Sequence, residues 1–364
     1  MSEQLVNYQC PSCTGPLHFD GATGKLKCDY CGSLFTVAEI EQYYAQQVEA
    51  AAEVVDQDPD WDLTMFGNWS AEEAAHLRAY NCPSCSAQLI CDENTAATSC
   101  PYCGNPTVVP GQFTGMLKPD FVLPFKLDKR QAIAALRKHY EGKRFLPNSF
   151  AANNHIQEIT GIYVPFWLFD ASVRGRALFD ATRVSTSRSG NEEITSTDHY
   201  RVTRGGEISF ENVPVDGSSK MPDAHMDAIE PFDFRDLKGF TTAYLPGFLA
   251  DRYDVSAEES SLRANERIRN STFDALAATV NGYSTVTRRQ SNAQISAGQV
   301  RYVLMPVWTL STKWNGKNFL FAMNGQTGKL IGDLPIDYGK YWQSFFGIAG
   351  VLMLIFYVLF FWIM

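Results

Sequence analysis

Residues 10–32 read CPSCTGPLHFDGATGKLKCDYCG, and residues 82–104 read CPSCSAQLICDENTAATSCPYCG. Each stretch holds two Cys-x-x-Cys pairs separated by 14 residues, and the two stretches align without a gap. Such a turn places two thiolates on one metal ion, and two turns joined by a short hairpin supply the four soft ligands of a structural zinc site. The sequence therefore predicts two zinc ribbons, with one Zn²⁺ in each, held by Cys10, Cys13, Cys28 and Cys31 and by Cys82, Cys85, Cys100 and Cys103.

Zinc is preferred to disulfides because eight of the nine cysteines lie in these pairs and the first ten residues, MSEQLVNYQC, show no apolar signal segment. We therefore expect the cysteines to face a reducing cytosol. Iron in a tetrathiolate site is the chemical alternative. The ninth cysteine, Cys91, aligns with Phe19 at an apolar hairpin position. We interpret it as a small buried hydrophobe, and a fifth ligand or a reactive thiol as the alternative.

The charge around the ribbons argues against nucleic acid. The chain of 364 residues carries a net charge of −9, and residues 1–120 hold 16 acidic residues but only four basic ones, Lys25, Lys27, Arg78 and Lys118. Phosphate binding needs lysine and arginine, and a four-thiolate zinc site adds about two further negative charges. The ribbons are therefore expected to contact protein, because zinc lets a module of roughly 25 residues fold and display a surface.

The remaining chain predicts an α+β fold. Helices are expected at residues 38–55, 70–79, 127–140 and 255–280, with Ser70 and Glu73 as a capping box. Two strands are expected over 161–183, an exposed hairpin tip at 185–198 and three strands over 300–335. A shared Pro-x-Trp pattern suggests a duplicated helix-plus-antiparallel-sheet unit. The predicted domains are ribbon 1 (1–37), a helical linker (38–79) with an acidic stretch at 56–62, ribbon 2 (80–112), α+β unit 1 (118–240), α+β unit 2 (241–340) and a transmembrane segment (345–364).

Residues 345–364, FFGIAGVLMLIFYVLFFWIM, contain no charge. At about 1.5 Å per residue this run spans roughly 30 Å, the thickness of a bilayer core. Lys340, Tyr341 and Trp342 precede it and Trp362 lies near its end, as interfacial anchors do. We expect a single-pass tail anchor in the inner (cytoplasmic) membrane, with everything before it in the cytosol.

No catalytic constellation is found in the sequence. It has no GxxxxGK[ST], HExxH or GxSxG motif, and its six histidines are scattered. Asp198-His199 and Asp223-x-His225 are interpreted as polar side chains at the surface rather than acid/base pairs. The acidic stretch 221–234 is interpreted as a solvated loop rather than a cation site. The basic positions of helix 255–280, together with Arg288 and Arg289, favour a solvated face over a lipid-headgroup site. We therefore predict a protein that is not an enzyme.

The pattern YxCPSC-x14-CxYCG, repeated, with VLPFKLDKRQA (122–132), a Pro-x-Trp strand and a terminal span, resembles a family of bacterial TFIIB-type zinc ribbon-containing membrane proteins, the YdjG-like group. Such proteins are also described as related to the primosomal helicase PriA, but this chain carries no ATPase motif. The resemblance implies a membrane-anchored adaptor that helps place SPFH (stomatin-like) scaffold proteins and phage-shock protein A homologues at the membrane. The alternative is a membrane-tethered nucleic-acid-binding protein.

Overall fold

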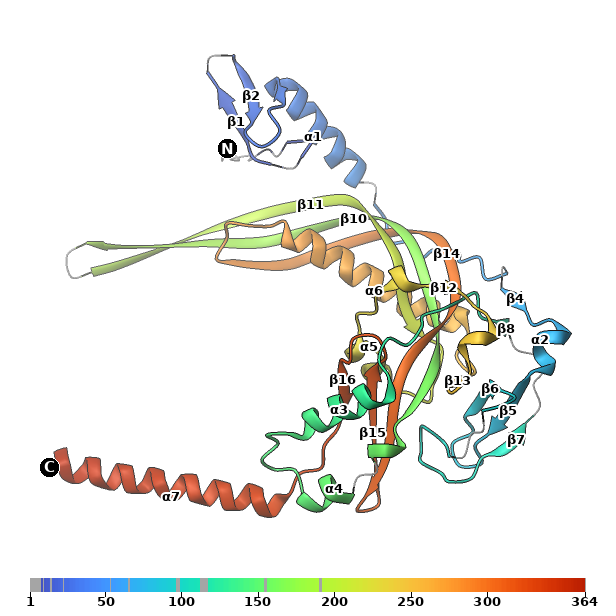
Figure 1. The fold of residues 1–364 in the computed structure, drawn as a ribbon. Helices are drawn as coiled ribbons and strands as arrows, with labels where there is room; N and C mark the ends of the chain where they lie inside the picture. Colours follow the sequence, from blue (N-terminus) through green and yellow to red (C-terminus); the bar gives the residue numbers. More distant parts are fainter. Residues whose placement is uncertain are drawn as a thin grey trace. The chain divides into compact units, whose positions relative to one another are not determined.

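The computed structural model describes residues 8, 10–13, 15–21, 23–52, 54–64, 66–95, 99–111, 117–153, 156–189 and 192–363 (Figure 1). Residues 1–7 and 112 of the predicted ribbons, His155 and residues 190–191 of the predicted hairpin tip lie outside them. The chain forms two compact units, and neither is a continuous stretch of sequence. The first contains Met1–Asp60, Ala171–Phe210 and Asn265–Gly298, and the second contains Trp61–Asp170, Glu211–Ala264 and Gln299–Met364.

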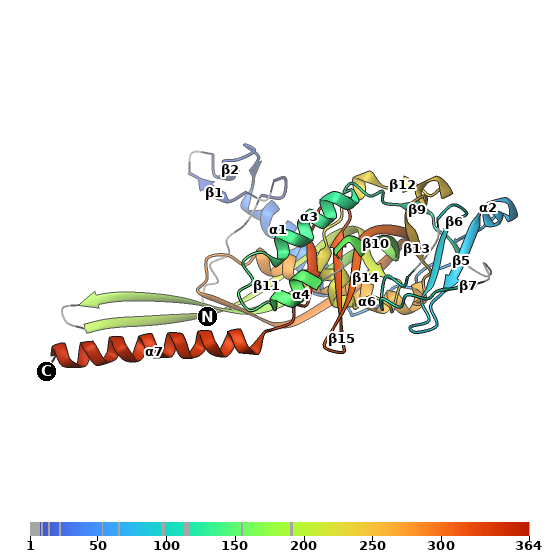
Figure 2. The ribbon, with the colours of Figure 1, turned by 60° about the horizontal axis from the view of Figure 1, so that its bottom comes forward.

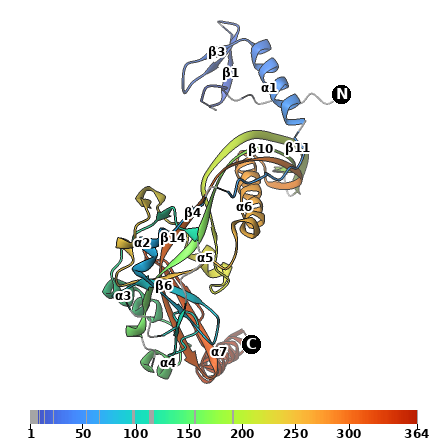
Figure 3. The ribbon, with the colours of Figure 1, turned by 90° about the vertical axis from the view of Figure 1, so that its right-hand side faces the viewer.

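Ribbon 1 is a small module within the first unit. Its antiparallel strands are β1 (Leu17–Asp20), β2 (Lys25–Cys28) and β3 (Leu34–Phe35), and α1 (Val37–Ala52) lies beside them (Figure 3). The core of the module consists of Cys10, Leu17, Cys28 and Ile40. So small a core cannot hold a fold without a metal or another crosslink.

The main sheet is mixed and large. Within the described residues it has eleven strands, in the order β12-β9-β14-β10-β13-β6-β5-β7, with β11 beside β10, β15 beside β14 and β16 beside β15. Its strands are β5 (Leu77–Asn81), β6 (Gln88–Asp92), β7 (Val109–Gly111), β9 (Phe121–Val122), β10 (Thr160–Ser189), β11 (Glu192–Asp216), β12 (Lys238–Gly239), β13 (Leu249–Asp251), β14 (Thr285–Trp314), β15 (Lys317–Asn324) and β16 (Leu330–Gly332). A separate pair joins β4 (Gly67–Asn68) to β8 (Leu117–Lys118).

The predicted duplication is not confirmed. Strands from both predicted α+β regions share the main sheet, and two of its pairs, β14 with β9 and β10 with β13, are parallel. The expected pair of strands over 161–183 is wrong, because β10 runs through this segment without a break. Its central Gly175 marks a close approach instead of a turn: a Cβ there would lie 2.6 Å from Cγ2 of Thr272. The three strands expected over 300–335 are present as β14, β15 and β16.

Helices form in each predicted segment. The helices after α1 are α2 (Ala71–Ala75), α3 (Lys129–Tyr140), α4 (Asn148–Asn153), α5 (Asp223–Ile229), α6 (Ala257–Ala278) and α7 (Tyr338–Ile363), with 3₁₀ turns at Ile156–Glu158, Phe234–Asp236 and Thr242–Tyr244. The helix expected at 70–79 ends at Ala75 because Leu77–Asn81 form β5, and α4 and α5 were not predicted. The capping box of Ser70 and Glu73 is confirmed, and α3 has a second box formed by Asp128 and Gln131. Leu136 of α3 is fully buried against the sheet.

One prediction about an acidic segment is wrong. The stretch 221–234 is not a solvated loop, because α5 places Met226 and Ile229, three residues apart, in the core of the second unit. The first part of the acidic linker 56–62 makes contacts within the fold. Within the first unit, Asp58 pairs with Arg269 at 2.6 Å, and Gln57 forms a bridge to Gln294. Its carboxylates are therefore engaged by the fold.

Candidate metal centres

The eight predicted ligands come together in two groups of four. In ribbon 1 the sulfurs of Cys10 and Cys31 are 3.5 Å apart and those of Cys13 and Cys28 are 3.4 Å apart. In ribbon 2 the distances from Cys82 to Cys103 and from Cys85 to Cys100 are both 3.6 Å. Within each group all four sulfurs lie within 4.8 Å of one another.

This geometry fits a metal ion. All nine cysteines are free thiols. A zinc–sulfur bond of about 2.3 Å places the corners of a tetrahedron about 3.8 Å apart, close to the observed sulfur separations. Four thiolates are the donor set of structural zinc. Each group can therefore hold one metal ion, which is consistent with zinc.

The backbone of the four knuckles follows one pattern. The amide of the first cysteine in each pair donates to the carbonyl five residues later, over 2.7 to 3.0 Å, in the pairs Cys10–Gly15, Cys28–Ser33, Cys82–Ala87 and Cys100–Asn105. Such a tight turn needs a residue with positive φ. Gly32 and Gly104 take this conformation at φ 73° and 67°, and Ser86 takes it at 59° in the first knuckle of ribbon 2.

One thiol in each ribbon is predisposed to lose its proton. The Ser33 hydroxyl lies 3.2 Å from the Cys31 sulfur and, with the Ser33 amide, lowers the pKa of Cys31 to about 6. Burial acts to raise the pKa of Cys82, but the amides of Cys85 and Ser84 overcome it and bring the value to about 7. Metal binding requires thiolates, and because burial raises the pKa values of Cys85 and Cys100, the metal ion itself must displace the protons of those two thiols.

The two ribbons differ in their surroundings. Ribbon 2 belongs to the main core of the second unit, and its strand β6 lies between β5 and β13 of the large sheet (Figure 2). Tyr102 is 4% exposed, whereas Tyr30 at the matching position of ribbon 1 is 79% exposed. Cys91 is fully buried, whereas Phe19, which aligns with it, is 61% exposed. Positions that are internal in ribbon 2 are therefore at the surface in ribbon 1.

Asp251 joins ribbon 2 to the α+β region. Its Oδ2 accepts hydrogen bonds from the hydroxyls of Tyr102 and Ser218, both at 2.6 Å, and burial raises its pKa to about 7. The sequence gives no sign of this link, because Tyr102 and Asp251 are 149 residues apart. The repeated tyrosine of CxYCG is the one feature that marks the position.

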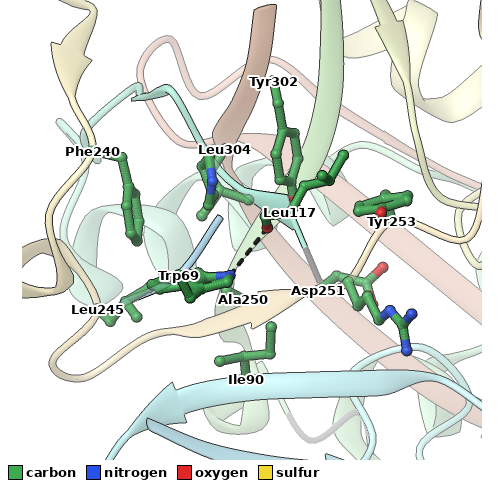
Figure 4. Close-up of a pocket in the computed structure, with 12 residues that line it drawn as sticks. Trp69, Ile90, Leu117, Phe240, Leu245, Ala250, Asp251, Tyr253, Tyr302 and Leu304 are labelled. Carbon is green, nitrogen blue, oxygen red and sulfur yellow. Dashed lines mark hydrogen bonds between the residues drawn. The ribbon is translucent and has the colours of Figure 1, made fainter. Parts of the chain in front are cut away.

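A pocket lies beside Asp251 (Figure 4). Ile90 of β6 lines it together with aromatic side chains of the α+β region, which are Trp69, Phe240, Tyr253 and Tyr302. The Trp69 indole donates to the Leu117 carbonyl at 3.1 Å. The wall is thus mainly apolar, and its single carboxyl group, that of Asp251, already accepts hydrogen bonds from two hydroxyls.

The other polar candidates are engaged within the fold or exposed to solvent, except His225, whose buried Nδ1 has no hydrogen-bond partner among the described residues. Cys91 is a buried thiol that donates to the Thr95 carbonyl at 2.9 Å, and burial raises its pKa to about 11. Its sulfur is not among the two groups of four. On α6, Arg263 pairs with Asp216 and Asp227 at 2.7 Å and with Asp223 at 3.1 Å. Asp198 and His199 are both exposed.

The C-terminal helix α7 is long and apolar enough to cross a membrane. Its span Tyr338–Trp362 has a mean hydropathy of 2.4, and none of it is buried in the fold. An apolar stretch of this length with no buried residues is stabilised by an apolar environment.

Comparisons with known proteins give one relative. No family model matches the chain, and no solved structure matches it. The uncharacterized protein YdjG of Bacillus subtilis (strain 168) is 34% identical over 346 residues, which covers 95% of this chain and 95% of the relative.

Proposed function

The chain belongs to the same family as YdjG of Bacillus subtilis, and we propose that it is a non-enzymatic adaptor that recruits cytosolic proteins to a membrane. In this proposal α7 spans the cytoplasmic membrane once and both ribbons lie in the cytosol, where thiols stay reduced. The family resemblance adds the candidate partners, SPFH (stomatin-like) scaffold proteins and phage-shock protein A homologues. Nucleic acid is not expected as a partner.

The contrast between the ribbons is the observation that supports the proposal most. Ribbon 2 shows how this module attaches to protein: its tyrosine is buried and donates to a carboxylate on a neighbouring strand. Ribbon 1 carries the same tyrosine, Tyr30, with most of its surface exposed, and Phe19 is exposed as well. Large exposed aromatic side chains are enriched at protein interfaces. Ribbon 1 therefore has the residues to anchor a separate protein.

Two lysines and one acidic residue, Asp29, lie close to Tyr30 in sequence. Lys25 and Lys27 of β2 are both exposed. A carboxylate of the partner could accept the Tyr30 hydroxyl, as Asp251 accepts that of Tyr102. It would then lie near Lys25 and Lys27, which are close to Tyr30 in sequence. We therefore propose that the partner presents an acidic residue among apolar ones.

Proximity labelling in cells tests the adaptor proposal. A labelling enzyme is fused to the N-terminus of the full-length chain, and the labelled cytosolic proteins of the wild type are compared with those of the Phe19→Ala, Tyr30→Ala double variant. The double variant should lose its main labelled partners, because interface anchors of this kind often contribute about 2 kcal/mol or more.

Leu262→Ala is the matched control, because Leu262 is 72% exposed on α6. It should retain all the partners. Zinc content of about two per chain in every variant verifies that the ribbons are folded. A double variant that retains both zinc ions and labels the same proteins as the wild type refutes the proposal that ribbon 1 recruits them.

A further inference from the structure

The base of α7 is fastened to the loop that follows α3. The Lys340 ammonium donates to the Leu146 carbonyl at 2.7 Å and to Oδ1 of Asn148 at 2.8 Å. The Asp337 amide donates to the Phe145 carbonyl at 2.8 Å. Figures 1 and 2 both show the first turn of α7 beside α4, which begins at Asn148. The loop therefore has a fixed position along the axis of α7.

That position corresponds to the headgroup layer of a bilayer. The ring of Phe145 packs on Tyr341, with centroids 5.7 Å apart. Tyr341 precedes Phe345, where the uncharged run begins, by four residues, which is about 6 Å along a helix. The headgroup layer on each side of the hydrocarbon core is about 5 to 7 Å thick. The exposed Trp342 lies in the same zone, as interfacial aromatic residues do.

The loop presents positive charge at this depth. Gly142, at φ +72°, turns the chain at the end of α3, and Lys143 and Arg144 follow it, both exposed. Within the described part of the chain, neither side chain is joined to a carboxylate by an ion pair. The last turn of α3 adds the exposed Arg137 and Lys138. One acidic residue, Glu141, lies among these four cations.

We propose that Lys143 and Arg144, with the basic last turn of α3, bind the phosphates of anionic phospholipids at the base of α7. Charge complementarity and the continuity of the loop with the membrane helix identify the partner as the lipid surface. Cations near an anionic membrane surface favour binding by an amount that corresponds to about fivefold per residue at low salt. This inference rests on the membrane span of the proposed function.

The full-length chain in nanodiscs tests it. The discs contain phosphatidylcholine with a rising mole fraction of phosphatidylglycerol, and amide exchange of the loop 141–148 is measured at low ionic strength. We expect protection of the loop to increase with phosphatidylglycerol. Lys143→Gln with Arg144→Gln should weaken the affinity for phosphatidylglycerol by about fivefold per residue, or roughly 25-fold together.

Lys129→Gln with Arg130→Gln is the matched control, because these exposed cations occupy the other end of α3, roughly 15 Å or more along its axis. The control should respond to phosphatidylglycerol as the wild type does. Equal protection in pure phosphatidylcholine, or equal responses of the two double variants, overturns the inference. Release of the wild-type chain from vesicles by alkaline carbonate shows instead that the span itself is wrong, and the inference fails with it.

Discussion

The hydrogen bond between Tyr102 and Asp251 ties ribbon 2 into the second unit, and Tyr102→Phe removes it while keeping the ring. The hydroxyl donates to a buried carboxyl group at 2.6 Å, and Ser218 is left as the other hydroxyl donor to Oδ2. The phenyl ring still fills its place in the core. The variant therefore measures the link between the ribbon and β13 without creating a cavity.

Above about pH 7 Asp251 is charged, and a hydrogen bond to a charged group contributes about 1.5 to 3 kcal/mol. The loss of a donor to a buried acceptor destabilises the fold by a similar amount. We expect Tyr102→Phe to lower the free energy of opening at β6 and β13 by about 1.5 to 3 kcal/mol. Amide protection there should then fall roughly tenfold to 150-fold. Tyr30→Phe is the matched control, because the Tyr30 side chain is mostly exposed. It should change protection by less than about twofold, as exposed substitutions do.

Amide exchange of the full-length chain in detergent micelles, resolved to the peptides that cover β6 and β13, measures the effect. Zinc content is determined in parallel, so that loss of metal is not mistaken for loss of the hydrogen bond. The reasoning is refuted if Tyr102→Phe leaves protection of β6 and β13 within twofold of the wild type, or if Tyr30→Phe lowers it equally.

Three further predictions follow from the site. The raised pKa of Asp251 means that the folded chain binds the carboxyl proton more tightly than the unfolded chain does. The stability that this group contributes is complete below about pH 4, and it falls by about 2.5 kcal/mol between pH 5 and pH 8. The free energy of unfolding of Asp251→Asn, measured over the same pH range, should lack this decline. Elemental analysis should give about two zinc ions per wild-type chain and about one in Cys28→Ser or Cys100→Ser. Of these two variants, only Cys100→Ser should lower the amide-exchange protection of the large sheet, because Cys100 is in its core. A chelator should remove the first zinc from ribbon 1, because Cys13 and Cys31 are exposed whereas both ribbon 2 partners are half-buried; loss of the ribbon 2 metal first, seen by differential cysteine alkylation, contradicts this order.

The metal centres were predictable because their information is local. Spacing within each Cys-x-x-Cys pair and a glycine after Cys31 or Cys103 define a knuckle without reference to the remaining chain. The capping box of Ser70 and Glu73 was predictable because all its atoms lie within four residues, whereas the box of Asp128 and Gln131 was missed although it is equally local. The terminal helix was predictable because length and hydropathy alone decide whether a segment can span a bilayer.

The parts that were missed depend on distant contacts. Gly175 looks like a turn residue in sequence, and only the approach of Thr272 from α6 explains it in the middle of a strand. The acidic stretch at α5 looks solvated until Arg263 is placed against Asp223 and Asp227. No local pattern distinguishes a buried ribbon from an exposed one, because the difference is made by a strand more than a hundred residues away.

The path of β10, β11 and β14 has a practical consequence for dissecting the molecule. Each of these strands, and α6 as well, contributes one part to each compact unit, so the chain passes between the units several times. A chain cut after residue 60 therefore leaves the first unit incomplete, and no continuous fragment contains one whole unit without also containing part of the other. Point substitutions in the intact chain are the appropriate means to assign a property to one unit, and deletion series would confound loss of a binding surface with loss of the fold.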